Sequence, residues 1–263
     1  MTRCYLNSMA MVSALGSDLE DIKARLLNGQ PQLEMSNEFN TSHAAVPLGK
    51  IQEALPELPL KDAKWQTRNN QIAWAVTSKL LPQIQSAIDK FGAERVAVII
   101  GTSTSGIGDS EFYLGQRALT GELSEKYHYG LQEMGATAHF IASATGAKGP
   151  TFGVSTACSS GAKALASGRR LIRSGFCDAV IAGGVEQCNP FSRNRNGINI
   201  GEAGGLFLMT KEASEIELLG VGESSDAHHI SAPDPTGAGA IRCMDLALKD
   251  AEIAPGDIDY LNL

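Results

Sequence analysis

Short apolar runs alternate along the chain with longer stretches of helical periodicity. The two clearest runs, 95–100 and 178–182, are almost continuously apolar, which is typical of strands buried on both faces of a sheet. Weaker strand patterns occur at 3–15, 151–157, 216–222 and 258–263. Helical patterns separate them at 17–28, 62–91, 110–119, 131–146, 159–173 and 236–251. This alternation predicts an α/β protein of βαβ units around a mainly parallel sheet.

Local signals refine three of these elements. Ser17 and Glu20 have the spacing of a capping box, which predicts a helix start at Ser17. Pro82 lies inside the long helical pattern and predicts a kink or a break there. Residues 30–60 contain four prolines and little periodicity, so we expect an irregular surface excursion.

Composition and charge exclude several classes of function. The chain has 263 residues, a net charge of −7 and 28 glycines, with 43% hydrophobic residues. The acidic balance argues against non-specific nucleic-acid binding, which needs a basic surface. The sequence has no apolar run of 18 or more residues and no continuous apolar segment near its start, so we expect neither a membrane span nor a secretory signal.

The five cysteines are odd in number and widely scattered, at positions 4, 158, 177, 188 and 243. No two of them form a CxxC pair, so we expect neither a zinc site nor a disulfide framework. The simplest interpretation is a reduced, cytoplasmic protein.

Cys158 stands at a position suited to a nucleophile. A predicted buried strand runs into Thr156-Ala-Cys-Ser-Ser-Gly161, and a helix is predicted to begin at once. A thiol at a helix N-terminus experiences a partial positive charge that favours the thiolate form. Backbone N–H groups of the first turn lack partners within the helix and can face a substrate oxyanion. A buried structural cysteine is the alternative at this point.

Four ordered segments make the chain resemble one enzyme family. GVSTACSSGAKAL (153–165) is similar to the active-site elbow of the β-ketoacyl-acyl-carrier-protein synthases, which are thiolase-like condensing enzymes. GTSTSGIGD (101–109) resembles the family's strand-exit loop, and SSDAHHISAPDPTG (224–237) the loop near its acyl pocket. NPFSRNRNGINIGEAGG (189–205) resembles the motif Phe-Asp-x-x-Arg-Asp-Gly-Phe-x-x-Gly-Glu-Gly-Ala, with departures at Ser192, Asn196, Ile198 and Ala203.

The resemblance implies a fold, a reaction and site residues. The fold would be the thiolase-like layered α/β fold, with 1–212 as most of the first half and 213–263 opening the second. Cys158 would be the acylated nucleophile, with its backbone N–H in the oxyanion hole, and Glu202 would support the site by orienting other groups. Acyl and malonyl thioesters of acyl carrier protein would be the substrates, without a metal or organic cofactor. Relatives form homodimers by extending their sheets near the elbow strand, here 151–157.

Two departures from the family bear on activity. Relatives place about twenty residues, including a helix, between the points that match Val185 and Gln187, so an internal deletion is expected there. The strand expected at 258–263 is followed in relatives by His-Gly-Thr-Gly-Thr, which carries the first catalytic histidine. A lysine, a second histidine and an oxyanion loop lie farther along in relatives. We therefore expect these 263 residues to be catalytically incomplete.

Three alternatives remain open. A non-catalytic partner of the chain-length-factor type would resemble the same family, although such relatives usually lack the elbow cysteine. A cysteine hydrolase of another family would need a base that a third residue orients, and no such pair stands out in the sequence; His228 or His229 is the alternative general base for Cys158. The arginines at 169, 170 and 173 form either a solvated face or a docking site for an acidic carrier protein.

Overall fold

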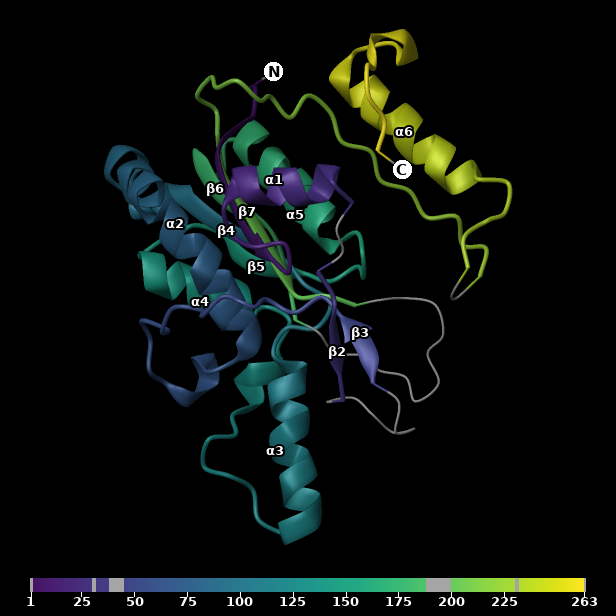
Figure 1. The fold of residues 1–263 in the computed structure, drawn as a ribbon. Helices are drawn as coiled ribbons and strands as arrows, with labels where there is room; N and C mark the ends of the chain where they lie inside the picture. The colour runs from purple at the N-terminus through teal and green to yellow at the C-terminus, as the bar shows by residue number, and fades with distance from the viewer. Residues whose placement is uncertain (1, 30–31, 38–44, 188–199, 230–231, 263) are drawn as a thin grey trace.

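The computed structural model describes all residues except 1, 30–31, 38–44, 188–199, 230–231 and 263 (Figure 1). Its strands are β1 (Tyr5–Ser13), β2 (Glu34–Ser36), β3 (Val46–Leu48), β4 (Val96–Gly101), β5 (Thr151–Val154), β6 (Ala179–Glu186) and β7 (Ala203–Thr210). Its α-helices are α1 (Leu19–Leu27), α2 (Arg68–Phe91), α3 (Ile107–Thr120), α4 (Ala136–Thr145), α5 (Ser160–Arg173) and α6 (Ala238–Ala251). No helix in these described ranges is long and apolar enough to cross a membrane.

One five-stranded sheet organises the molecule, in the order β1-β7-β6-β4-β5. β4 pairs in parallel with β5 and β6, whereas β7 pairs antiparallel with β6 and with β1. The prediction of a mainly parallel sheet is therefore wrong for half of its pairings. The reason is β7, which we did not predict because its glycine pair weakens the strand pattern and its start overlaps the family motif.

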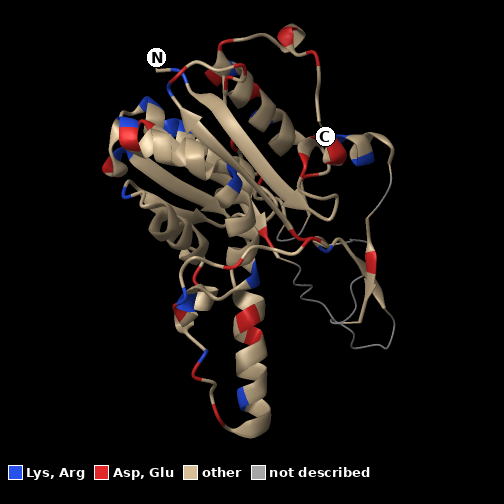
Figure 2. Ribbon diagram, turned by 60° about the vertical axis from the view of Figure 1, so that its left-hand side comes forward, with Lys and Arg blue, Asp and Glu red and all other residues tan. Residues whose placement is uncertain are grey.

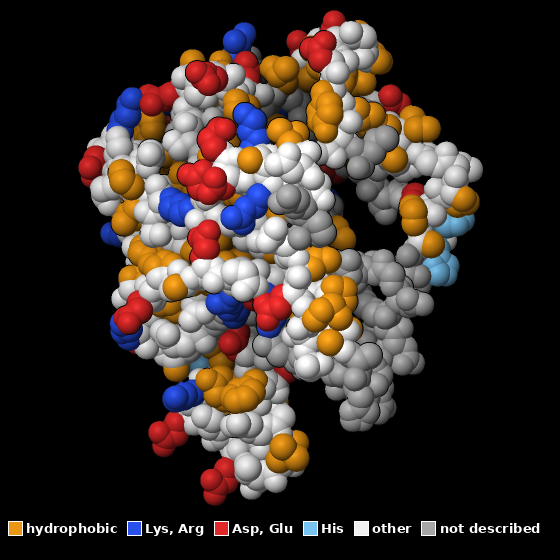
Figure 3. Space-filling model, viewed as in Figure 1, with side chains coloured by type: hydrophobic (Ala, Val, Ile, Leu, Met, Phe, Trp, Pro, Cys, Tyr) orange, Lys and Arg blue, Asp and Glu red, His pale blue; other side chains and the backbone are white. Residues whose placement is uncertain are grey.

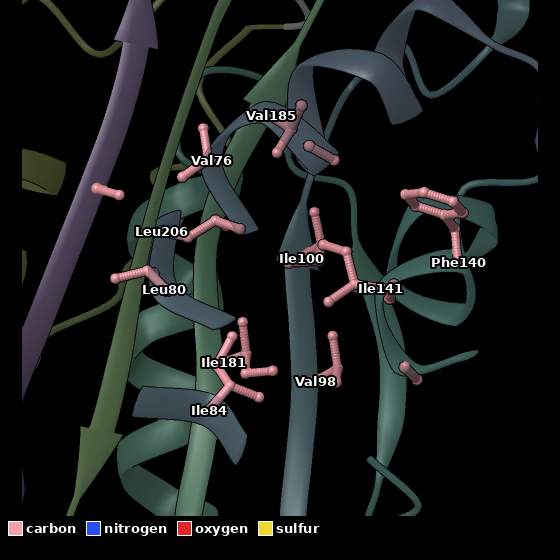
Figure 4. Close-up of a cluster of buried hydrophobic side chains, with 14 of the residues drawn as sticks. Val76, Leu80, Ile84, Val98, Ile100, Phe140, Ile141, Ile181, Val185 and Leu206 are labelled. Atoms are coloured by element: carbon pink, nitrogen blue, oxygen red, sulfur yellow. The ribbon is translucent and has the colours of Figure 1, made fainter. Parts of the chain in front are cut away.

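Helices cover both faces of this sheet, which confirms the predicted layered α/β fold. Val98 and Ile100 of β4 face α2 and α4, while Ala97 and Ile99 face α5. The alternation follows from the two-residue period of a strand, and it explains why all six residues of β4 are buried. Figure 4 shows the larger of the two cores, between the sheet and the helices α2 and α4. Charged residues, coloured blue and red on the ribbon of Figure 2, lie mainly on the helices and loops around the sheet.

Two local predictions need correction. The N-cap of α1 is Asp18, whose carboxylate accepts the N–H groups of Glu20 and Asp21, so the helix does not begin at Ser17. α2 is one continuous helix through Pro82, so the predicted break is wrong, whereas the predicted kink stays a prediction. Pro82 is exposed, and the buried face of α2 packs against the sheet along its length, so packing outweighs one lost hydrogen bond.

The excursion at 30–60 contains the short β2–β3 hairpin.

The C-terminal segment, 216–262, forms less regular structure than predicted. Residues 216–218 join the outer edge of β1 through Leu6 N–H to Ile216 O (2.9 Å) and Leu218 N–H to Cys4 O (2.9 Å), but they form no strand of their own. The strand predicted at 258–263 is absent from its described part, 258–262, because no described strand lies beside it. No side chain of α6 is buried. In Figure 3, orange apolar side chains are visible on the surface at the upper right, where Figure 1 places α6.

Candidate active site

Cys158 lies at the tip of a sharp turn between β5 and α5. The strand ends at Val154, the helix begins at Ser160, and the Cys158 side chain is exposed. The structure therefore confirms the predicted position within one turn of a helix start. Ala157, just before the cysteine, has a φ of +53°, which costs a non-glycine residue about 1–2 kcal/mol. Such strain persists only where surrounding contacts enforce it.

Hydroxyl groups hold this elbow. Ser160 Oγ accepts the N–H of Thr156 (2.9 Å) and donates to the carbonyl of Ala157 (2.6 Å). Ser159 Oγ lies on the exposed side and contacts Thr156 O (2.8 Å) and Thr156 Oγ1 (3.0 Å). The elbow is thus closed by its own side chains within five residues.

Glycines let the start of α5 rest directly on the sheet. A Cβ added to Gly101, the last residue of β4, would lie 2.3 Å from the carbonyl carbon of Ser160. A Cβ on Gly184 of β6 would lie 3.3 Å from the Cα of Gly161. The carboxyl ends of the parallel strands β4, β5 and β6 therefore meet at the elbow. Backbone contact of this kind fixes the height of Cys158 above the sheet.

Glu186 is a residue of this edge that sequence reasoning missed. Its carboxylate, at the end of β6, accepts the Ser103 N–H (2.5 Å), Ser103 Oγ (2.8 Å) and Thr104 Oγ1 (2.7 Å). It thereby fixes the loop that follows β4. The available signal was an acidic residue four positions after the buried apolar run 178–182, but we interpreted this segment only as the site of the expected deletion next to Val185.

Cysteine environments differ sharply among the described residues. Burial raises the pKa of the Cys4 thiol to about 11 and that of the Cys177 thiol to about 12. Cys243 is half-buried and donates its Sγ–H to Gly222 O (2.9 Å). Cys158 is the exposed cysteine of the described part, and Cys188 lies outside it. The exposed position is the one suited to meeting a substrate.

Glu202 is buried and bound to groups outside the elbow. Its carboxylate accepts the Arg68 guanidinium through Nε (2.9 Å) and Nη2 (2.8 Å), and also the Ile51 N–H (3.1 Å). Arg68 begins α2, and its backbone N–H donates to Asp109 (3.1 Å). Burial is the main cause that raises the pKa of the Asp109 carboxyl. Glu202 thus anchors α2 and the loop at 49–51, and its role in supporting catalysis stays a prediction.

The remaining candidate residues lie in two other segments of the chain. Residues 189–199 of the family motif at 189–205, which include Arg195, lie outside the described residues, and His228 and His229 are exposed on the loop before α6. Within the described residues, no cluster of three or more His, Cys, Asp or Glu side chains could hold a metal ion.

The arginine cluster on α5 is occupied by ion pairs. Arg169 is almost fully buried and donates to Leu218 O (2.9 Å), Leu219 O and Asp250 Oδ2 (2.5 Å). Arg173 binds the same Asp250, and Arg170 binds Glu223 (2.6 Å). These contacts join α5 to the C-terminal segment, so they argue against the docking interpretation of the cluster.

Family models match most of the chain. The model "Beta-ketoacyl synthase, N-terminal domain" matches residues 6–188, and "Beta-ketoacyl synthase, C-terminal domain" matches 216–263. The 3-oxoacyl-[acyl-carrier-protein] synthase 2 of Staphylococcus aureus is 28% identical, over 99% of this chain and 72% of the relative. The enzyme of the same name from Synechocystis is 25% identical over the same shares.

Solved structures show the same fold. A complex of the ketosynthase ApeO with its chain length factor ApeC from Xenorhabdus doucetiae matches with a TM-score of 0.89 and 38% identity, over 98% of this chain and 70% of that one. The ishigamide ketosynthase/chain length factor matches with a TM-score of 0.80 and 26% identity, over 98% and 72%. A beta-ketoacyl synthase from Burkholderia phymatum, at 23% identity, has a TM-score of 0.83 over 100% and 74%.

The alignment with the Staphylococcus relative also bears on length. It runs over 301 positions, whereas this chain has 263 residues. At least 38 residues of the relative therefore have no counterpart in this chain. β6 continues unbroken through Val185 to Glu186. The deletion expected beside these residues, and the division of the chain at 212 and 213, stay predictions.

Proposed function

The chain belongs to the beta-ketoacyl synthase family, and we propose that it acts in 3-oxoacyl-[acyl-carrier-protein] synthesis with Cys158 as nucleophile. The observation that carries this proposal is the exposed Cys158 thiol at a strained elbow, two residues before a helix of fourteen residues. The other described cysteines are buried or half-buried. A structural cysteine would not need this exposure or this strain.

Acyl transfer is the first half of the proposed reaction. The Cys158 thiolate attacks the thioester carbonyl of an acyl carrier protein, and a sulfur–carbon bond forms as the carbonyl oxygen becomes an oxyanion. The backbone N–H of Cys158, just before the N-terminus of α5, stabilises that oxyanion. The tetrahedral intermediate collapses and expels the carrier thiolate, which takes a proton. The acyl group then remains on Cys158 as a thioester.

Carbon–carbon bond formation is the second half. A malonyl thioester on the carrier protein loses CO2, and the electron pair of the broken carbon–carbon bond stays on the α-carbon as a carbanion. This carbanion attacks the acyl carbonyl on Cys158, and a new carbon–carbon bond forms. The sulfur–carbon bond breaks, Cys158 regains its thiolate, and a 3-oxoacyl thioester two carbons longer leaves. We propose that this product is used in fatty acid or polyketide synthesis.

We propose further that a polypeptide of these 263 residues performs the first half better than the second. The resemblance assigns decarboxylation to two histidines in segments that follow the match to 258–263. General acid–base groups contribute about 10²–10⁴ to a rate, and one oxyanion donor about 10²–10³. Acyl transfer needs the elbow and the start of α5, which these residues supply.

A chain-length-factor type of partner is the second candidate, favoured by one observation. Two of the similar structures are named as complexes of a ketosynthase with a chain length factor. Cys158 and its elbow favour the ketosynthase role over the partner role.

Pairing with a second subunit, identical or related, is also proposed. β5 is an edge strand of the sheet, and its Phe152 is 37% exposed. This edge supports dimer formation by sheet extension. A molecular mass of about 28 kDa in light scattering at micromolar concentration would contradict a stable homodimer.

The proposed function is tested by giving the protein an acyl carrier protein loaded with a saturated acyl chain. We expect intact-mass spectrometry to show one acyl group, located on Cys158 by peptide mapping, and none on Cys158→Ala. CO2 release and 3-oxoacyl product from malonyl carrier protein measure the second half. Acylation of the alanine variant at the normal rate would overturn the assignment, and rapid product formation by the 263-residue polypeptide would overturn the proposed division of the reaction.

A further inference from the structure

Ser160 connects the peptide group that precedes Thr156 with the peptide group that follows Ala157. Its Oγ accepts from Thr156 N–H (2.9 Å) and donates to Ala157 O (2.6 Å), and its backbone N–H donates to the same carbonyl (3.0 Å). The residue is only 2% exposed. Both hydrogen bonds of the hydroxyl are therefore made within the elbow, and the hydroxyl is not directed at substrate. We infer that Ser160 is a positioning residue for the Cys158 nucleophile, acting through the conformation of Ala157.

The left-handed backbone of Ala157 is what the hydroxyl has to maintain. Ala157 has a φ of +53°, a region that L-residues avoid because Cβ approaches the following carbonyl oxygen. The dihedral angles of one residue set the direction of the next, so this conformation decides where Cys158 points. A relaxed Ala157 would turn the thiol away from the helix start.

Neighbouring serines distinguish this role from a general need for hydroxyls. Ser159 is exposed, and its Oγ contacts Thr156 without bridging Ala157. Ser167, farther along the same helix, donates its Oγ to Lys163 O (2.8 Å) as an ordinary helical side-chain contact. Ser167→Ala thus removes a hydroxyl from α5 at a distance from the elbow and serves as the matched control.

This inference rests on the proposed function, because it assumes that Cys158 attacks an acyl donor. Small misplacement of a reacting group can cost about 100-fold in rate. We expect Ser160→Ala to lower the rate of Cys158 acylation at saturating donor about tenfold or more. The donor concentration for half-maximal rate should stay within twofold, because no substrate contact is removed.

The experiment compares the parent protein with Ser160→Ala, Ser167→Ala and Cys158→Ala. Acyl transfer is followed by intact mass at several donor concentrations, circular dichroism melting checks folding, and iodoacetamide measures the bare reactivity of Cys158. We expect at least tenfold slower acylation and at least threefold slower alkylation for Ser160→Ala, and changes below twofold for Ser167→Ala. Equal losses in both serine variants, or none in Ser160→Ala, would overturn the inference.

A second background tests whether the hydroxyl acts through Ala157. Glycine adopts positive φ readily, so in Ala157→Gly the left-handed conformation depends less on the hydrogen bonds of the Ser160 hydroxyl. We expect Ser160→Ala to slow alkylation and acylation less in that background, by threefold or less where the parent background loses tenfold. An equal loss in both backgrounds would contradict the mechanism. If the parent is not acylated, the proposed function fails, while the alkylation rates still decide the role of Ser160.

Discussion

The sheet region, 3–210, and the C-terminal segment, 216–262, contain similar apolar patterns but bury them very differently. All six residues of β4 are inaccessible, whereas α6 has no buried side chain and Ile258, Tyr260 and Leu261 are 45%, 80% and 56% exposed. The difference lies in what faces each pattern. β4 has strands on both sides and helices on both faces, while α6 is joined to the rest mainly by polar contacts with α5. An apolar run therefore stabilises a fold only where a second layer covers it.

The largest expected effect comes from one substitution made in both regions. Ile100→Ala removes a fully buried side chain between the sheet and α2, and we expect it to lower the free energy of unfolding by about 2–5 kcal/mol. Ile241→Ala in α6, at a side chain 53% exposed, should change it by less than about 0.5 kcal/mol. Urea denaturation followed by circular dichroism measures both. Equal losses would show that the C-terminal segment is as well packed as the sheet.

Thiol labelling extends the comparison to single sites. Cys4 and Cys177 are buried in the sheet region, with pKa values of about 11 and 12, so little thiolate is exposed there at pH 7.5. We expect iodoacetamide to label Cys158 at least tenfold faster than either, with Cys243 intermediate because it is half-buried. Peptide mapping after timed quenching gives the rates. Faster labelling of Cys4 than of Cys158 would contradict both the described burial and the nucleophilic role.

Asp250 offers a smaller effect confined to the junction of the two regions. It accepts from Arg169, Arg173 and the Val221 N–H. We expect Asp250→Asn to increase the hydrogen-exchange rate of α6 amides severalfold and to leave β4 amides unchanged, because the contact of Val221 and both guanidinium pairs weaken together. Exchange detected by mass spectrometry resolves the two regions. As a control, Glu57→Gln removes an exposed pair with Lys61 and should change neither.

Acid should act on the same junction in a defined direction. Burial alone would raise the pKa of the Asp250 carboxyl, but the Val221 N–H and the two guanidinium groups outweigh it and lower the pKa below its ordinary value. A lowered pKa means that the contribution is complete above about pH 4, the ordinary carboxyl range, and disappears as the pH falls through the folded value. We expect the protection of α6 amides, measured relative to the intrinsic exchange rate at each pH, to fall below about pH 4 before that of β4 amides. A simultaneous fall in protection would show that the junction is not the weaker region.

Sequence patterns predicted the element types of the sheet region well because each pattern had a strong local cause. The apolar runs at 95–100 and 178–182 became β4 and β6, and the small-residue stretch after Cys158 became α5. The same reasoning failed at β7, whose strand is stabilised by pairing with β1 and β6 on both sides. It failed again at 258–262, where apolar residues have no strand beside them in the described structure. Strand formation depends on neighbours that local patterns do not contain.

By itself, the sequence determined the layered α/β class, the family resemblance and the choice of Cys158 as the candidate nucleophile, since these depend on period, composition and short motifs. Only the tertiary structure decided the mixed direction of the sheet, the glycine contacts beneath the elbow and the partners of Glu186 and Glu202. It also decided that the α5 arginines pair with Asp250 and Glu223. The physical reason is that these features join residues far apart in the chain. Pairing, close backbone approach and ion-pair partners follow from position in space, which no local pattern of side chains specifies.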